Sequence, residues 1–468
     1  MLLRRSCRRF NSTSLNNAVD TLAEITTTNK WKYKLDDNVE SDLQNEKIKT
    51  KRHPGIVPSA PINIPESFIK AAKIILEDDC YIPKKQLSGR SENFVKYLKA
   101  KKPPMEQDEL QAHISNLKTK VIKGLQKSKK DLLSDEHVMK SQLTNLMKKT
   151  VYNWFPVKYD IAQSLCYLVG RSAAEYAVLI KILSEIKLRN PDWKPLTLFD
   201  FGSGVGTVTW AANTIWPKSF TEYFNVDSSA SMNDLAELLL KGGRGEKEIS
   251  LRGVYYRQFF PSKPVPYDLV VSAYTLMELP SLKSRLDAVR QLWSKTMRYL
   301  VIVEQGSYAG FKVINEVRDF ILSLGNSHVF SPCAQDYPCP QFASNKELPC
   351  NFAVRYHDLP LNDISQNLRK EKFSYIVLKK GKRSENDSQW PRLINPTLIR
   401  HKHVICTLCT KEGKIEQSVF TASKYGKLAF RCAKASDWGD RLPMTVKDTP
   451  DDVIVDENVN LDKEITNK

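Results

Sequence analysis

The chain lacks any long apolar run. No window holds roughly 18 or more apolar residues without a charge, which excludes a membrane-spanning helix. Cysteine is scarce, with nine among 468 residues, so the chain is no secreted disulfide scaffold. Acidic residues are outnumbered by basic ones, 53 against 71, and the net charge is +18 at pH 7. This imbalance fits binding to a long polyanion such as RNA and argues against an ordinary acidic metabolic enzyme.

The first twenty residues contain no acidic side chain before Asp20. They are rich in serine and threonine, and their basic residues are Arg4, Arg5, Arg8 and Arg9. This composition is typical of a mitochondrial presequence, which predicts a location in the mitochondrial matrix after removal of the segment. The alternative is a basic RNA-binding tail on a cytosolic protein.

Composition predicts five parts of the chain. They are a presequence (1–20), a basic helical N-terminal region (21–150), an α/β domain (151–385), a β-rich appendage (386–445) and an acidic tail (446–468). Residues 101–150 hold eleven lysines against six acidic residues, which indicates either solvated helix faces or a surface that lies on phosphates. Residues 160–187 show apolar positions at helical spacing, which predicts one or two core helices.

From residue 196, short apolar runs alternate with amphipathic stretches. The runs are TLFDF, EYFNV, YDLVVSA, YLVIVE and finally FSYIVLKK at 373–380. This alternation predicts parallel strands joined by crossover helices in an open α/β sheet. Beyond a polar break after Gly381, the pieces HVICTLCT, SVFTA and KLAFRCA predict the β-rich appendage.

The strand TLFDF runs into a glycine loop of the form D-x-G-x-G-x-G, made by Asp200, Gly202, Gly204 and Gly206. Glycines allow a tight turn and close approach of a ligand to the backbone, and the next helix presents free N–H groups. The spacing differs from that of dinucleotide-binding and phosphate-binding loops. It resembles the S-adenosylmethionine loop of class I methyltransferases.

Two further elements have the order expected of that superfamily. Asp227 follows the next predicted strand, where a carboxylate can accept hydrogen bonds from a ribose diol. The stretch 267–280 resembles the strand and loop that close the same pocket. The predicted fold is therefore a class I S-adenosylmethionine-dependent methyltransferase-like open sheet. The alternative is a sheet that keeps this shape and binds nothing.

No catalytic residue is assigned. Ser272, Ala273 and Tyr274 stand where amino methyltransferases carry an Asn/Asp-Pro-Pro-aromatic loop, and no cysteine is there to attack a pyrimidine. Glu278 is the nearest candidate for a general base, although a carboxylate in a first helical turn is more often a cap.

The cysteines gather late in the chain. Cys333, Cys339 and Cys350 lie in one proline-containing loop, and Cys406 and Cys409 form a C-x2-C pair farther on. Four thiolates can hold zinc or an iron–sulfur cluster, and this spacing leaves zinc, a cluster or no metal open. His357 is a possible substitute ligand.

The glycine loop, VIVEQGSYAGFKVINEVRDFIL, SPCAQDYPCP, EKFSYIVLKK and HVICTLCT together resemble the mitochondrial small-ribosomal-subunit methyltransferase-like family. The resemblance covers about 150–445, and its most specific part is an E-x-G-x-x-x-G-F motif, Glu304 to Phe311, together with the cysteine loops. It implies a matrix protein that binds the immature small ribosomal subunit and its rRNA. It also implies a 4Fe-4S cluster held by Cys333, Cys339, Cys350 and Cys409, with Cys406 where the family usually has an aliphatic residue.

Three functions follow as hypotheses. The first is a ribosome-assembly factor that uses a methyltransferase fold for binding. The second is an active S-adenosylmethionine-dependent methyltransferase of mitochondrial small-subunit rRNA. The third is a permanent structural protein of the small subunit.

Overall fold

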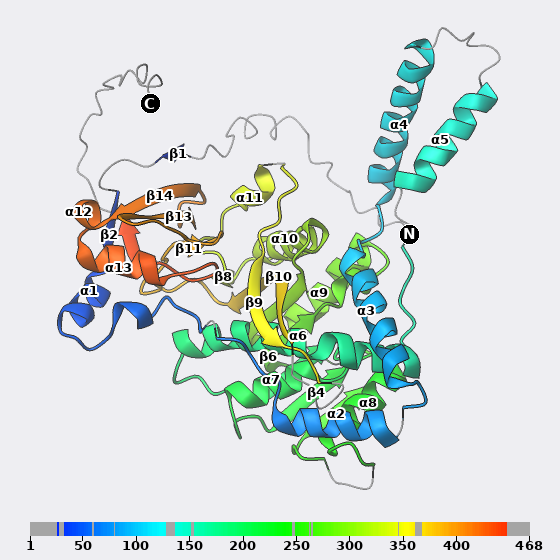
Figure 1. Ribbon diagram of the computed structural model, residues 1–468, viewed down its shortest axis with the longest axis horizontal. Helices are drawn as coiled ribbons and strands as arrows, with labels where there is room; N and C mark the ends of the chain where they lie inside the picture. The colour runs from blue at the N-terminus through cyan, green and yellow to red at the C-terminus, as the bar shows by residue number, and fades with distance from the viewer. Residues whose placement is uncertain are drawn as a thin grey trace, which may run out of the picture.

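The computed structural model describes residues 26–27 and 32–446, with gaps at 59, 79, 128–135, 151–153, 246–248, 262, 264, 345 and 361–366 (Figure 1). The predicted presequence, and all of the predicted acidic tail except Val446, lie outside the described residues. Among the helices that are described, none has the length and apolar character needed to cross a membrane.

An eight-stranded sheet forms the centre of the molecule, in the order β5-β4-β3-β6-β7-β10-β8, with β9 paired to β10. Neighbouring strands from β5 to β7 are parallel: β3 (Thr197–Phe201), β4 (Glu222–Val226), β5 (Val254–Arg257), β6 (Tyr267–Ala273) and β7 (Thr296–Gln305). The remaining strands are β8 (Ser327–Ser331), β9 (Phe352–His357) and β10 (Leu368–Lys380). This order confirms the methyltransferase-like open sheet.

The prediction that every strand is parallel was wrong for β10. It runs antiparallel to β7, to β8 and to β9. A hairpin from β9 turns the chain back, so β10 enters the sheet between β7 and β8. Because β10 is buried along most of its length, its apolar run looks like that of a parallel strand in the sequence.

Helices cover both faces of the sheet. One face packs against α6 (Ile161–Arg189), α7 (Thr207–Ile215) and α8 (Ala230–Leu240), and α2 (Glu66–Asp78) and α3 (Lys84–Ala100) pack on these helices as a further layer. The other face packs against α9 (Leu282–Lys295) and α10 (Tyr308–Ser323). The predicted core helix at 160–187 is confirmed as one helix, α6, whose first turn is capped by Asp160.

The N-terminal region contributes to three parts of the molecule. The helices α2 and α3 pack on the α/β domain, whereas α4 (Gln107–Lys127) and α5 (Glu136–Thr150) form a hairpin that projects from it (Figure 1). The strand β2 (Tyr33–Leu35) and helix α1 (Asp37–Gln44) join the core of the C-terminal appendage.

The appendage combines a small sheet with two short helices. Its strands are β1 (Thr26–Thr27), β11 (Arg392–Leu393), β12 (Leu398–Ile399), β13 (His403–Cys409) and β14 (Ile415–Thr421), and β15 (Met444–Val446) pairs with β2. The helices are α12 (Ala422–Tyr425) and α13 (Lys427–Ala435). The prediction of KLAFRCA as a β-piece was wrong, because Ala429, Cys432 and Ala433 face the core at helical spacing.

Candidate functional site

The glycine loop lies between β3 and α7. Gly202, Gly204 and Gly206 have φ angles of 74°, 49° and 79°, a left-handed backbone that favours glycine. A Cβ on Gly202 would also lie 2.0 Å from Thr275 Oγ1, in the loop after β6. The backbone conformation and this close approach therefore require the glycines that the sequence motif contains.

The side chain of Asp200, in β3 just before this loop, has no hydrogen-bond partner among the described residues. It is fully buried, and neither carboxylate oxygen is paired within the described residues. Burial raises the pKa of Asp200 well above its usual range, and the nearby Asp227 and Glu175 raise it further. A buried acid of this kind can receive a hydrogen bond from a donor group on a ligand.

Asp227 braces the loop. Its Oδ2 accepts the Gly204 N–H at 2.9 Å, and its Oδ1 accepts the Ser229 N–H at 2.9 Å. An ionised carboxylate has about four acceptor sites, so these bonds leave capacity for a ribose hydroxyl. Burial raises the pKa of Asp227, while the two backbone bonds oppose that effect.

Tyrosines from α6 and the segment before it cover the loop. The Tyr167 ring edge lies 3.8 Å from where a Cβ on Gly204 would stand, and Ser229 Oγ donates to the Tyr159 carbonyl at 2.7 Å. Beside them is a cavity of about 20 Å³, also lined by Tyr274 and Glu304. That volume holds about one water molecule, so the side chains must move to admit a larger ligand.

The short helix η2 (Leu276–Glu278) lies on the side of the glycine loop where a methyltransferase would hold its methyl acceptor. We call this the acceptor side, and other side chains cover it here. Glu278, the candidate base, forms an ion pair with Lys101, which is 2% exposed. Trp154 Nε1 donates to the Met277 carbonyl at 3.1 Å, and the Lys101 ammonium lies 5.4 Å from the Trp154 ring centroid. Sequence reasoning missed both covering residues, because Lys101 and Glu278 are 177 positions apart and no local pattern joins them.

The E-x-G-x-x-x-G-F motif spans the end of β7 and the first turn of α10, and it packs tightly. Glu304 Oε1 accepts the Met277 N–H at 3.2 Å, and burial raises the pKa of Glu304 to about 8. A Cβ on Gly306 would lie 2.6 Å from the Lys372 backbone, and one on Gly310 would lie 2.1 Å from the Gln305 carbonyl oxygen. The motif therefore has a packing role that supports the η2 loop.

The four cysteines of the predicted metal site are brought close enough to interact electrostatically. Burial raises the pKa of Cys350, and Cys339, Cys333 and Cys409 each raise it further. Burial also raises the pKa of Cys409, and Cys333 and Cys339 add to this effect. The long gap in the sequence is thus closed by β13, which carries Cys409 to the loop of the other three.

Cys406 lies on the other side of β13. Residues three apart in a strand point to opposite faces, so only one member of the C-x2-C pair can face the loop. Cys406 is fully buried, and burial raises its pKa to about 12. His357, the possible substitute ligand, instead makes a 2.6 Å hydrogen bond through Nδ1 to Asn63 Oδ1.

Two buried arginines flank the thiols. Burial lowers the pKa of Arg318, but Cys333, Asp319 and Cys339 more than offset this and raise it. Arg392 also lowers the pKa of Cys350 and of Cys409. These guanidinium groups supply positive charge where four thiolates would otherwise repel one another.

Among the described residues, no three His, Cys, Asp or Glu side chains are grouped so as to hold one metal ion. The four cysteines can still lie near one another without meeting the spacing that a single metal ion requires. Around a single zinc, thiolates lie only about 3.8 Å apart, given a Zn–S bond of about 2.3 Å. Cys339 and Cys409 are buried and Cys333 and Cys350 are partly buried, and these four thiols beside two arginines would suit a thiolate-bound metal group chemically.

The strand order and the glycine loop define a methyltransferase-like protein. A family model described as "Mitochondrial small ribosomal subunit Rsm22" matches residues 161–443, and the chain belongs to this family. The human "Ribosome assembly protein METTL17, mitochondrial" is 36% identical over 403 residues, covering 84% of this chain and 86% of that protein. The "Rsm22-cox11 tandem protein 2, mitochondrial" of Schizosaccharomyces pombe is 26% identical over 61% of this chain and 44% of its own length.

Solved methyltransferases are also similar in structure. Magnesium protoporphyrin IX methyltransferase from Synechocystis, 10% identical, matches 51% of this chain and 91% of its own length with a TM-score of 0.30. The plantazolicin methyltransferase BpumL, 11% identical, matches 58% of this chain and 99% of its own length with a TM-score of 0.29.

Proposed function

We propose that this protein binds the mitochondrial small ribosomal subunit and its rRNA in the matrix, as an assembly factor built on a methyltransferase fold. The observation that carries the proposal is the 36% identity with METTL17 over 84% of the chain, together with the family match over 161–443, which includes both the α/β domain and the appendage. Sedimentation of a matrix extract tests it: the chain should comigrate with immature small subunits. Absence from all subunit fractions would contradict binding, and equal retention on mature subunits would indicate a permanent component instead.

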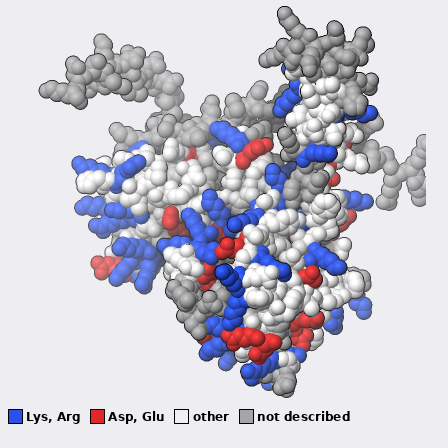
Figure 2. Space-filling model, turned by 45° about the vertical axis from the view of Figure 1, so that its right-hand side comes forward, with Lys and Arg blue, Asp and Glu red and all other residues white. Residues whose placement is uncertain are grey.

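A basic face on the appendage supports contact with RNA. In α13, Lys427, Arg431 and Lys434 are exposed and recur at helical spacing, so they share one side of the helix. The short helix η1 (Thr50–Arg52), with exposed Lys51 and Arg52, packs against α13 and adds to this face. Figure 2 shows lysine and arginine side chains gathered at the left of the molecule, where the appendage lies.

Reversing the charges of the α13 face should weaken RNA binding and its salt dependence. With roughly five phosphate contacts on a duplex, log K of the protein should fall about 4–5 units per tenfold rise in salt. The variant Lys427→Glu/Arg431→Glu/Lys434→Glu should reduce that slope by about 2–3 units, since each lost phosphate contact removes about 0.7–0.9. Filter binding of small-subunit rRNA fragments at several salt concentrations measures both slopes.

The matched control has the same net charge. Lys194, Lys218 and Lys283 are exposed and lie on the α/β domain, so their replacement by Glu changes total charge equally. If this control lowers the slope as much as the α13 variant does, the basic face has no special role and only overall charge matters.

The covered acceptor side favours binding over catalysis. Methyl transfer needs room for a nucleotide beside η2, and that loop is covered by Trp154 and by the Lys101–Glu278 pair. The second candidate, an rRNA methyltransferase, is favoured by a different observation. The buried, unpaired Asp200 carboxylate lies beneath three left-handed glycines, an arrangement suited to S-adenosylmethionine with Asp227 on its ribose.

The variant Gly204→Val should lose S-adenosylmethionine binding, measured by titration calorimetry. A β-branched residue is strongly disfavoured at a φ of 49°, and its side chain would extend into the space beside Tyr167. Gly245→Val is the control, because a Cβ there meets nothing within 4 Å. If wild-type protein binds no S-adenosylmethionine, the cofactor proposal is wrong. If subunit assembly survives Gly204→Val, the result supports the binding function. If both rRNA methylation and subunit assembly are lost, the result supports the methyltransferase function.

A 4Fe-4S cluster on Cys333, Cys339, Cys350 and Cys409 completes the proposal, with zinc as the alternative occupant. Support comes from the mutual electrostatic effects of these four thiols, two buried and two partly buried, and from the flanking Arg318 and Arg392. Such a group would join the loop at 333–350 to β13 and so tie the appendage to the α/β domain. Its binding energy would then contribute to folding.

A further inference from the structure

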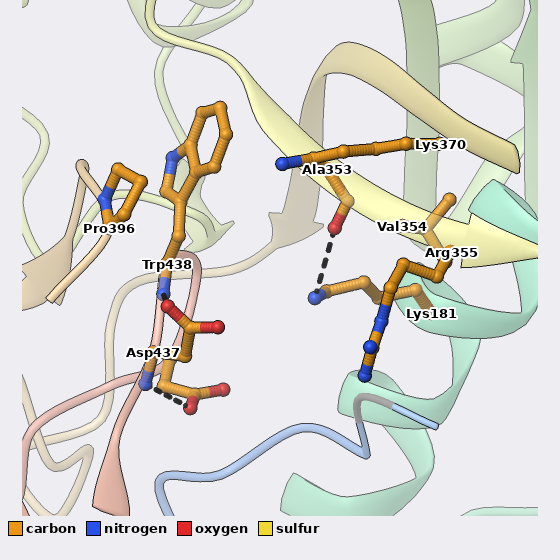
Figure 3. A pocket seen from close by; sticks show the side chains of 9 residues that line it. Lys181, Ala353, Val354, Arg355, Lys370, Pro396, Asp437 and Trp438 are labelled. Atoms are coloured by element: carbon orange, nitrogen blue, oxygen red, sulfur yellow. Dashed lines mark hydrogen bonds between the residues drawn. The ribbon is translucent and has the colours of Figure 1, made fainter. Parts of the chain in front are cut away.

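A hollow of about 290 Å³ lies where the α/β domain meets the appendage (Figure 3). We name it the Trp438 pocket. The appendage contributes Pro396, Asp437 and Trp438, and the α/β domain contributes Arg355, Lys370 and Lys181. A volume near 300 Å³ is at the small end of ligand sites, which suits a single nucleotide.

Trp438 lines this hollow. The indole is half-buried, and the ammonium groups of Lys370 and Lys372 lie 5.3 Å and 5.9 Å from its ring centroid. Its buried Nε1–H has no hydrogen-bond partner among the described residues. Both lysines are exposed, so their side chains can swing from the ring to a phosphate. Aromatic faces with adjacent cations are what proteins use to stack unpaired bases.

The polar groups of the pocket are of both signs. Lys181 Nζ donates to the Ala353 carbonyl at 3.3 Å, and burial lowers the pKa of Lys181. Asp437 is exposed, and its Oδ1 accepts the Trp438 N–H at 2.7 Å. A carboxylate repels a simple anion but accepts hydrogen bonds from the exocyclic amino group of a base. The pocket therefore favours adenine, cytosine or guanine over uracil.

A larger groove of about 810 Å³ shares one lining residue, Lys370, with the pocket. Its other basic residues are Lys96, Lys99 and Arg369. Lys99 pairs with Glu371 and Arg369 pairs with Asp358, so the groove is mixed in charge and only moderately basic. A single strand can follow such a groove with its phosphates near Lys96 and Lys370.

We infer that the Trp438 pocket binds one unpaired, amino-bearing base of a single-stranded RNA, stacked on the Trp438 indole, with its phosphate at Lys370. The inference rests on the proposed RNA-binding function and assigns it a second contact, distinct from the basic face of α13. Because both structural units line the pocket, RNA bound there would also hold them together.

Binding of short fluorescent oligoribonucleotides to the full chain tests this. Trp438→Leu should weaken oligoadenylate binding about 10- to 100-fold, the effect of losing one stacked base, and leave an abasic ribose-phosphate oligomer unaffected. Trp438→Phe should retain most of the affinity, and oligouridylate should bind wild type more weakly than oligoadenylate does. Lys370→Gln should lower the salt slope by about 0.7. Phe259→Leu, at an aromatic residue that is 82% exposed elsewhere, is the control and should change nothing.

Four results would overturn the inference. If Trp438→Leu binds oligoadenylate as well as wild type does and sediments normally with small subunits, the pocket does not bind a base. The proposed function would then still stand. Failure of wild type to bind any oligomer would end both the inference and the proposed rRNA contact. If AMP binds as tightly as the oligomer, the occupant is a free nucleotide; if only subunit association depends on Trp438, it is a protein segment.

Discussion

Cys409→Ser protein purified without oxygen should contain no iron or labile sulfide, whereas the wild-type protein is expected to contain the proposed 4Fe-4S cluster. One serine in place of a thiolate removes the ligand from β13, and the other three all lie in the loop at 333–350. Residues 385–445 should then become sensitive to protease, because binding energy of the cluster no longer holds the appendage. Iron and sulfide assays measure the cluster content, limited proteolysis measures the protection of residues 385–445, and circular dichroism measures folding. The α/β domain should stay folded.

Cys406→Ser is the matched control and should keep its iron. Cys406 is as deeply buried as its neighbour but faces away from the loop, so its loss affects packing alone. If Cys406→Ser instead loses the metal, the assignment of the fourth ligand is wrong. A wild-type protein with one zinc and no iron would contradict the cluster, although the link between the loop and β13 could remain.

Glu185→Gln should lower the free energy of unfolding by about 3–5 kcal/mol, the usual effect of removing one partner of a buried ion pair. Arg392 of β11 donates to both carboxylate oxygens of Glu185, at 2.7 Å and 3.1 Å. The same guanidinium also donates to the carbonyls of Pro332 and Gly439, each at 2.8 Å. This pair therefore joins α6, the cysteine loop and the appendage. Urea unfolding followed by circular dichroism measures the loss.

The pH dependence of this pair has a definite sign. Burial alone would raise the pKa of Glu185, but Arg392 reverses that and lowers it to about 2. A lowered acid pKa means that the stabilisation is fully present above the unfolded value, about 4.5, and is lost as pH falls from there towards 2. Wild type should lose stability across that window, and Glu185→Gln should lose much less.

Two controls separate the buried pair from ordinary charge effects. Glu77→Gln removes an exposed partner of Lys84 and should cost less than about 1 kcal/mol. The double variant Glu185→Leu/Arg392→Met removes both charges and should recover much of the loss, because no unpaired charge stays buried. If Glu185→Gln is no more harmful than Glu77→Gln, this junction does not hold the appendage.

Much of the fold could be predicted because local patterns dictate it. Strands buried on both faces are continuous apolar runs, and five of them appeared in order in the sequence. The direction of β10 could not be predicted, since a buried strand has the same pattern in either direction. The helix α13 was missed for a related reason, because a short apolar run is ambiguous between a strand and a helix.

The methyltransferase-like sheet, the glycines of the loop and the family could all be predicted from sequence alone, because each depends on residues that are neighbours in the chain. Which distant groups meet depends on how the chain packs in three dimensions. Tyr33 and Glu416, 383 positions apart, share a 2.6 Å hydrogen bond, and Lys101 covers the acceptor loop through Glu278. Likewise, the register of β13 turns Cys409 towards the cysteine loop and Cys406 away from it. Such contacts depend on how whole elements pack, and the burial and charge pairing that stabilise them leave no periodic signal in the sequence.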